Sequence, residues 1–347
     1  MAYADTLART WRQNILFSVL LELTYRCNLD CFFCYNDTKL AGRPLGTQQY
    51  FRLFEELRAL GTLNLTLSGG EPLAHPEFFA LGRRARELGF LVRVKTNGHA
   101  LRGSLLERMQ EEVDPFIVEL SLHGATAETH DRQTRVTGSF ARLVANVRAA
   151  RALGLRLKIN SALTAWNEHE IEAMFALADE AGVPLQFDPQ ITRRDDGDRE
   201  PLEIAPSPEG MARLFRIQRQ RAGSREPGPQ ASSATMEKPA PGAHDKHCGA
   251  GSSTVVVDPY GNVYPCVQWR RRIGNLHESS IGTLWNHSTE LTEVRRLALE
   301  ARQAVDRHGI PGLAFCPGTA EQETGHATQL YPVAMLLLDL RKRLPVT

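Results

Sequence analysis

The feature that most constrains the fold is a regular alternation of short apolar segments with amphipathic segments between about residues 19 and 189. The apolar segments predict six strands, at 19–24, 63–68, 91–96, 116–122, 156–162 and 185–189. The segments between them predict helices at 47–60, 76–88, 101–112, 140–153 and 168–181. Repeated βα units predict a parallel sheet covered by helices. Six units are too few for an eight-stranded barrel, so we expect an α/β fold, a partial (βα)6 barrel over residues 15–190.

The pattern changes after residue 190. Residues 191–246 predict a connecting segment, with a helix at 207–221 and a linker rich in Pro, Gly and Ser at 222–243. Residues 247–347 predict a small α+β domain that ends in a helix from about 333 to 344. Within it, the turn Asp258-Pro-Tyr-Gly-Asn262 between two alternating segments predicts a β-hairpin.

Composition excludes several classes of protein. The 41 Lys and Arg residues are balanced by 40 Asp and Glu residues, which leaves no basic surplus for a nucleic acid. No run of about 18 apolar residues predicts a membrane span, and no signal peptide is evident. Six cysteines are too few for a disulfide scaffold in a chain of 347 residues. Their clustering is typical of metal ligands in a reducing compartment, so we expect a cytoplasmic protein.

Three cysteines, Cys27, Cys31 and Cys34, follow the first predicted strand. In a parallel barrel, active sites gather at the carboxyl ends of the strands. One short loop with this spacing can wrap its sulfurs around a single metal centre. Three thiolates leave one position of an iron–sulfur cluster open, because a complete cluster normally takes four protein ligands. The alternatives are a zinc site completed by a distant histidine, and unrelated buried thiols.

The CxxxCxxC spacing, with the aromatic Phe33 before the third cysteine, resembles the signature of the radical S-adenosylmethionine (radical SAM) family. The resemblance implies a [4Fe-4S] cluster whose open iron binds S-adenosylmethionine through its amino and carboxylate groups. It implies reductive cleavage of this cofactor to methionine and a 5′-deoxyadenosyl radical. The partial (βα)6 barrel is also the core fold of that family.

The resemblance extends to the ends of later strands. Ser68-Gly-Gly-Glu-Pro72 is similar to the GGE motif that contacts the methionine amino group, although Gly-Gly-Glu alone is most often a turn. Lys95-Thr-Asn-Gly98 is similar to the TNG segment near the cofactor ribose, although Asn-Gly alone predicts an ordinary strand exit. The residues expected to contact the cofactor are Phe33, Gly69, Gly70, Glu71, Pro72, Thr96, Asn97, Ser121 and Asn160.

His123 is the one candidate for a catalytic group. It follows the fourth predicted strand, where the related subfamily usually has Asp. A histidine can donate or accept a proton near neutral pH, but in this position it can equally pack or cap.

A second set of cysteines, Cys248, Cys266 and Cys316, lies in the predicted C-terminal domain. Gly261 precedes Cys266 with four residues between them, as in the C…Gx4C half-motif of SPASM and twitch domains. A full SPASM domain continues with a cysteine-rich run, but here only Cys316 follows, and Thr319 stands where a CxxC partner would be. The resemblance therefore implies a truncated domain with one auxiliary [4Fe-4S] cluster and an incomplete ligand set.

The fourth ligand of that cluster is left open between Glu321, Glu323, His326, water and substrate. A disulfide between Cys248 and Cys266 is the alternative, and it conflicts with a reducing compartment. The basic run 270–272 is interpreted as a solvated turn.

Relatives with auxiliary clusters mostly modify ribosomally made peptides. The resemblance therefore implies a precursor peptide as substrate, a separate leader-recognition protein, and a flavodoxin- or ferredoxin-type reductant. The alternatives are a radical SAM oxidase, dehydrogenase or cyclase of a small molecule, and a non-catalytic metal- or redox-sensing protein.

Overall fold

The structure is a computed structural model that describes residues 3–223, 246–307 and 315–343. The predicted linker at 222–243 therefore lies, apart from its first two residues, outside the described residues. None of the described helices is long and apolar enough to cross a membrane.

Within the described residues, nine strands form one sheet in the order β6-β5-β4-β3-β2-β1-β7-β8-β9. Neighbours from β6 to β7 pair in parallel, and β8 and β9 complete the sheet with antiparallel pairing. The strands are β1 Ser18–Glu22, β2 Asn64–Ser68, β3 Leu91–Thr96, β4 Ile117–Ser121, β5 Leu157–Ala162, β6 Leu185–Asp188, β7 Thr254–Val257, β8 Asn262–Tyr264 and β9 Gly274–Asn275. The six barrel strands match the predicted ones to within two residues at each end, and the parallel α/β core is confirmed.

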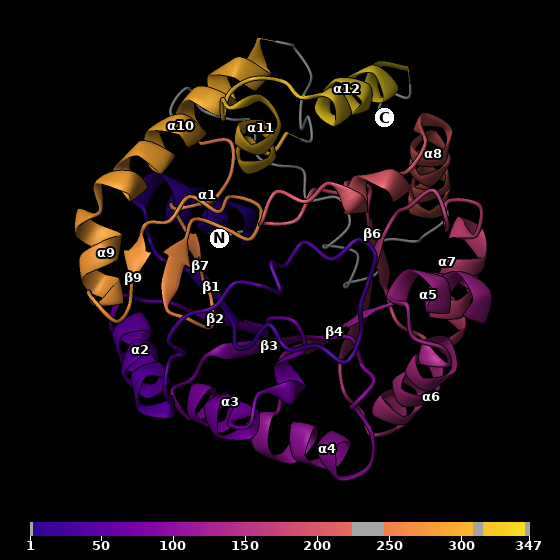
Figure 1. Cartoon of the computed structure of the whole chain (residues 1–347), viewed down its shortest axis with the longest axis horizontal. Coiled ribbons are helices and arrows are strands. Elements are labelled where there is room, and N and C mark those ends of the chain that lie inside the picture. Colours follow the sequence, from indigo (N-terminus) through magenta and orange to yellow (C-terminus); the bar gives the residue numbers. More distant parts are fainter. Residues whose placement is uncertain (1–2, 224–245, 308–314, 344–347) are drawn as a thin grey trace.

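Helices cover the outer face of the curved sheet (Figure 1). The helices of the described residues are α1 Tyr3–Gln13, α2 Thr47–Ala59, α3 Phe78–Glu87, α4 Gly103–Arg108, α5 Ala127–Thr134, α6 Ser139–Ala152, α7 Ile171–Glu180, α8 Pro208–Gly223, α9 Ile281–His287, α10 Thr289–Asp306, α11 Pro317–Thr324 and α12 Pro332–Arg343. Short turns of helix lie at Pro72–Ala74, Met109–Val113 and Glu200–Ile204. The helix predicted at 101–112 is divided, because α4 passes into the wider turn Met109–Val113.

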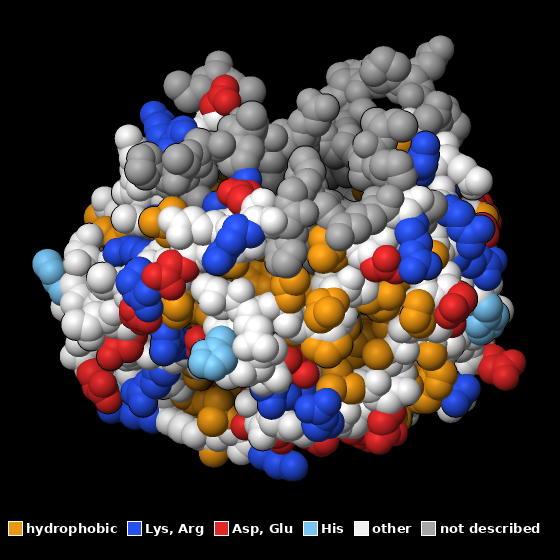
Figure 2. Space-filling view, turned by 90° about the horizontal axis from the view of Figure 1, so that it is seen from above, with side chains coloured by type: hydrophobic (Ala, Val, Ile, Leu, Met, Phe, Trp, Pro, Cys, Tyr) orange, Lys and Arg blue, Asp and Glu red, His pale blue; other side chains and the backbone are white. Residues whose placement is uncertain are grey.

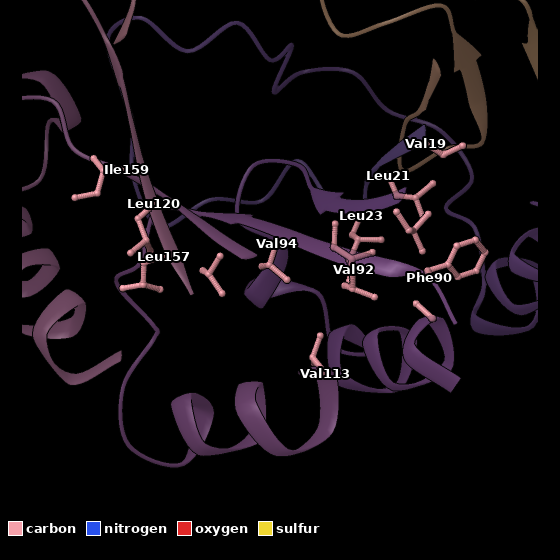
Figure 3. Packing of buried hydrophobic residues seen from close by; sticks show 14 of the residues in the cluster. Val19, Leu21, Leu23, Phe90, Val92, Val94, Val113, Leu120, Leu157 and Ile159 are labelled. Carbon is pink, nitrogen blue, oxygen red and sulfur yellow. The ribbon is translucent and has the colours of Figure 1, made fainter. Parts of the chain in front are cut away.

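The core lies between the sheet and these outer helices. Figure 3 shows Val19, Leu21, Val92, Val94 and Leu120 within it, on alternate positions of their strands. The positions between them turn to the other, concave face of the sheet. Several of these are polar, such as Glu22 on β1, Arg93 on β3 and Glu119 on β4. A sheet with helices on both faces has apolar side chains on both. This alternation therefore marks a barrel interior lined by polar groups.

The C-terminal region shares its sheet with the barrel. Its hairpin, β7 and β8, forms as predicted, and Asp258 accepts hydrogen bonds from the backbone N–H groups of Tyr260 and Asn262, both at 2.9 Å. However, β7 pairs with β1 in parallel, from Ser18 opposite Thr254 to Leu21 opposite Val257. The sheet of the barrel therefore continues into the C-terminal region.

One face of the molecule is seen in Figure 2, from the side where α10, α11 and α12 lie in Figure 1. Basic and acidic side chains are interspersed on it, in keeping with the balance of charge along the chain. The described side chains on this face form no broad basic surface.

Candidate active site and metal centres

The first three cysteines lie on one loop, residues 27–34, which we call the cluster loop. Helix α5 anchors this loop, since the N–H of Asp30 donates to Thr134 O at 3.2 Å and that of Phe32 to Gln133 O at 2.9 Å. Burial raises the pKa of all three thiols, and at Cys31 the neighbouring Cys34 and Cys27 raise it further. The structure thus brings the three sulfurs together, and binding a metal there must displace their protons.

The glycines after β2 let the backbone pass close to the start of the cluster loop. Gly69 has a φ of +132°, and a Cβ there would lie 2.4 Å from Thr24 O. A Cβ at Gly70 would lie 2.7 Å from the carbonyl oxygens of Tyr25 and Arg26. The N–H of Gly70 donates to Thr24 O at 2.7 Å. Packing within the protein alone therefore requires glycine at both positions.

Glu71 is 2% exposed, and its carboxylate is already occupied by protein groups. Oε1 accepts hydrogen bonds from Thr96 Oγ1 at 2.7 Å and Leu73 N at 3.0 Å, and Oε2 accepts one from Asn97 N at 2.8 Å. Burial raises the pKa of this carboxyl, and these hydrogen bonds oppose the rise. Glu71 therefore joins the end of β2 to the end of β3. Pro72 follows it at the start of a short helical turn.

Asn97 continues this link to the cluster loop. Its Nδ2 donates to Asn28 Oδ1 at 2.8 Å and lies 3.7 Å from Cys27 Sγ. Asn36, two residues after the cluster loop, links the chain there to the end of β2. It is 4% exposed, and its Nδ2 donates to Gly69 O at 3.4 Å. Sequence reasoning missed Asn28 and Asn36, since a single amide in a loop gives no pattern.

His123 is buried, and its ring lies 4.3 Å from that of Phe33 between centroids. Burial, and then His130, hold the pKa of His123 well below its ordinary value. Its Nδ1 has no hydrogen-bond partner in the described part of the chain. The His123 ring therefore packs against the cluster loop and keeps one ring nitrogen without a partner among the described residues.

Ser121 and Asn160 lie opposite each other on β4 and β5, facing the interior of the barrel. The Nδ2 of Asn160 donates to Glu119 Oε2 at 2.8 Å, and Arg93 Nε donates to Glu119 Oε1 at 3.0 Å. Burial raises the pKa of Glu119, but Lys95 and Arg93 outweigh it and hold the pKa below its usual range. The interior next to Ser121 thus contains a fixed, ionised carboxylate.

The C-terminal cysteines also come together. Burial raises the pKa of the Cys266 thiol, and Cys316 and Cys248 raise it further. Gly318 fits Cys316 closely against the segment after Cys266, since a Cβ there would lie 2.3 Å from Gln268 O. None of the six cysteines, all of which lie within the described residues, forms a disulfide, so the Cys248–Cys266 disulfide is absent there.

Of the three side chains considered for a fourth ligand, two lie near arginines and one is exposed. Glu321 Oε1 lies 3.9 Å from Arg271 Nε, and Glu323 Oε1 lies 3.9 Å from Arg193 Nε. His326 is exposed just past the end of α11. Thr319 is 5% exposed, and its N–H lies 3.5 Å from Cys316 Sγ.

The interpretation of residues 270–272 as a solvated turn is wrong for Arg270. Its side chain is 12% exposed, and its two terminal nitrogens donate to the carboxylate oxygens of Glu22 at 3.0 and 2.7 Å. Arg270 Nε also lies 2.8 Å from Asp195 Oδ2 in an ion pair that lacks hydrogen-bond alignment. The N–H of Asp195 donates to Tyr35 O at 2.8 Å, directly after the cluster loop. Arg270 therefore connects the segment after Cys266 to the first metal centre.

Among the described residues, no three His, Cys, Asp or Glu side chains converge tightly enough to hold one metal ion. A four-iron cluster instead takes each thiolate at a different iron atom. Two sets of three thiols, without a fourth cysteine in either, fit clusters better than single ions.

Comparison with known proteins identifies the family. Residues 21–178 match the Radical SAM superfamily, and residues 248–308 match the SPASM iron–sulfur cluster-binding domain. The mycofactocin maturase MftC of Mycobacterium ulcerans is 30% identical over 290 residues, which cover 79% of this chain and 75% of that protein. The chain belongs to the radical SAM superfamily.

Other relatives match over different lengths. The PqqA peptide cyclase of Ruegeria pomeroyi is 38% identical over 168 residues, which cover 48% of this chain and only 45% of that protein. The AdoMet-dependent heme synthase of Methanosarcina barkeri is 28% identical over 79% of this chain and 83% of that protein. Among solved structures, native anSMEcpe with bound AdoMet has a TM-score of 0.72 at 18% identity, over 94% of this chain and 96% of that chain, and supports the radical SAM fold.

As a radical SAM enzyme, the chain uses a [4Fe-4S] cluster and S-adenosylmethionine, and its SPASM domain binds an auxiliary iron–sulfur cluster. Membership of this superfamily sets aside the zinc alternative and the non-catalytic sensor. The SPASM match ends at residue 308, before Cys316.

Proposed function

We propose that this radical SAM enzyme modifies a ribosomally made precursor peptide by abstracting a hydrogen atom from it. The observation that supports this most is the extent of similarity to the mycofactocin maturase, which covers 79% of the chain. The similarity to a PqqA peptide cyclase points the same way over a shorter stretch. When bound, the cluster and S-adenosylmethionine supply the 5′-deoxyadenosyl radical, as in other members of the superfamily.

In this proposal Cys27, Cys31 and Cys34 hold the cluster, and the backbone of Gly69, Gly70 and Pro72 forms the adjoining wall of the cofactor site. Glu71 acts as a positioning residue, because its carboxylate holds Thr96 and the Asn97 backbone in place. Asn97 in turn orients the cluster loop through Asn28. Phe33, Ser121 and Asn160 complete the cofactor site.

In the C-terminal region, Cys248, Cys266 and Cys316 hold one auxiliary four-iron cluster. The remaining iron then has no cysteine ligand. The candidates for its fourth ligand are Glu321, Glu323, His326, water and substrate.

Two partners belong to the same proposal. A flavodoxin- or ferredoxin-type reductant would supply the electron, which reductive cleavage draws from outside the chain. A separate leader-recognition protein would present the peptide. Six cysteines without a disulfide among the described residues favour the reducing cytoplasm as the compartment.

The test is an anaerobic reaction of the reconstituted protein with dithionite, S-adenosylmethionine and a candidate precursor peptide labelled with deuterium. We expect 5′-deoxyadenosine that carries deuterium, and a peptide whose mass has changed. The variant with alanine at all three cysteines of the cluster loop is the control and should form neither. Formation of unlabelled 5′-deoxyadenosine with every labelled peptide would contradict the proposal that a peptide is the substrate. It would not contradict cleavage of S-adenosylmethionine by the enzyme.

A small molecule is the second candidate substrate. The similarity to the heme synthase of Methanosarcina barkeri covers as large a share of this chain as the similarity to the maturase. The two candidates are separated by incubation with a porphyrin substrate in place of the peptide, with product detection by mass spectrometry.

A further inference from the structure

The auxiliary site contains a buried hydrogen-bond donor without an acceptor. Trp269 is 2% exposed, and its Nε1 has no hydrogen-bond partner in the part of the chain that the structure describes. An indole N–H can only donate. Buried polar groups are nearly always paired, so an orphaned donor needs an explanation such as a missing ligand.

Trp269 lies beside the cysteines of this site. Its backbone N–H donates to Cys266 O at 3.2 Å, and a Cβ at Gly318, two residues after Cys316, would lie 2.8 Å from Trp269 Cβ. Trp269 forms a small core cluster with Ala250, Val294 and Ala327. Cys248, Cys266 and Leu297 pack against this cluster. Trp269 thus packs in one cluster with Cys248 and Cys266, and its Cβ lies next to the segment that carries Cys316.

The other buried tryptophan of the region behaves differently. Trp285 is 5% exposed, and its Nε1 donates to Asn14 O at 3.0 Å. The fold can therefore satisfy an indole in this region, and the unpaired donor occurs at the tryptophan beside the cysteines.

We propose that Trp269 Nε1–H donates a hydrogen bond to a sulfur atom of the auxiliary cluster. Hydrogen bonds to cluster sulfurs are among the groups that set the reduction potential, because they stabilise the more negatively charged, reduced state. Trp269 is in this view a positioning and tuning residue, which raises the potential of the auxiliary cluster without ligating it. The inference rests on the presence of that cluster and is independent of the substrate.

The test compares Trp269→Phe with Trp285→Phe in the reconstituted holoenzyme, which holds both clusters. Each variant keeps an aromatic ring and removes one indole N–H. Redox titration is followed by electron paramagnetic resonance, and the signal that S-adenosylmethionine leaves unchanged is assigned to the auxiliary cluster. For Trp269→Phe we expect full iron content and a fall of about tenfold in the ratio of reduced to oxidised auxiliary cluster at a fixed potential, equivalent to about 59 mV for one electron. Trp285→Phe should leave that ratio unchanged.

A second measurement reports on the hydrogen bond itself. With 15N-labelled tryptophan, pulsed electron paramagnetic resonance of the reduced auxiliary cluster should show a hyperfine coupling to nitrogen. This coupling should disappear in Trp269→Phe and persist in Trp285→Phe. An unchanged potential in Trp269→Phe, or a coupling that survives in it, would overturn the proposal. If Trp269→Phe loses the auxiliary cluster altogether, the labelled wild type still tests the proposal. Absence of a tryptophan nitrogen coupling in the wild type would overturn it.

Discussion

Arg270 offers the sharpest test of how the two metal centres are held together. We expect Arg270→Met to destabilise the protein strongly, because it leaves Glu22, which is 0% exposed, without its cation. Removing one partner of a buried ion pair costs about 3–5 kcal/mol. The loss of the 2.8 Å contact to Asp195 acts in the same direction. An exposed pair would cost only about 0–1 kcal/mol.

The assay is urea unfolding under anaerobic conditions, followed by tryptophan fluorescence. A change of stability appears as a lower midpoint at an unchanged slope. The double variant Glu22→Gln with Arg270→Met should recover part of the loss, since it no longer contains the uncompensated buried carboxylate at Glu22. Arg272→Met is the matched control, because Arg272 is 53% exposed and its contact to Glu278 is 3.8 Å.

A loss below about 1 kcal/mol for Arg270→Met would refute this reasoning and restore the solvated turn for residues 270–272. A double variant that is as unstable as the sum of the two single variants would refute the pairing with Glu22 specifically.

The remaining predictions concern the clusters, the cofactor and pH. The reconstituted protein should bind about eight irons, which is the content of two four-iron clusters, and alanine at the three cysteines of the cluster loop should remove about half of them. Chemical iron analysis measures both contents. About four irons in the wild type and none in the variant would exclude the auxiliary cluster. Glu71→Ala should weaken S-adenosylmethionine binding by about 1.5–3 kcal/mol, measured by equilibrium titration, because Thr96 and Asn97 lose a charged acceptor, and unchanged affinity would contradict this. Burial raises the pKa of Asp195 from 3.8 to about 7, with Arg270 opposing the rise. The folded state therefore holds this proton more tightly, so the contribution of Asp195 to stability is full below about pH 4 and is lost as the pH rises through 7. Urea midpoints across this range should show a steeper fall in the wild type than in Asp195→Asn, and parallel curves would argue against the raised pKa.

The sequence predicts the strands well because each contains a local apolar pattern. It does not predict α5, Ala127–Thr134, whose sequence is almost entirely polar. A residue distant in the sequence stabilises the start of this helix: the Glu170 carboxylate accepts hydrogen bonds from Thr126 Oγ1 at 3.0 Å and Thr129 Oγ1 at 2.7 Å. The cluster loop depends on the end of α5, so an element that anchors the site gives no local signal.

The same limit applies to charged partners. Arg270 stands in a basic run that indicates a solvated surface, and Glu22 stands in an apolar strand far away in the sequence. Only the pairing of β1 with β7 places them in contact. The cysteine spacings are the opposite case, because the three thiols of the cluster loop are close in sequence and their proximity needs no tertiary information.

The pairing of β1 with β7 has a consequence for how the chain is made. β1 is synthesised early, but the strand beside it, Thr254–Val257, emerges only after most of the chain. Until then one side of β1 presents unpaired backbone N–H and C=O groups, which are a template for association with other chains. A shortened version that ends before β7 would keep that exposed edge permanently. We therefore expect such a fragment to aggregate, and chimeras that exchange auxiliary regions between relatives to need a β7 whose side chains fit the resident β1.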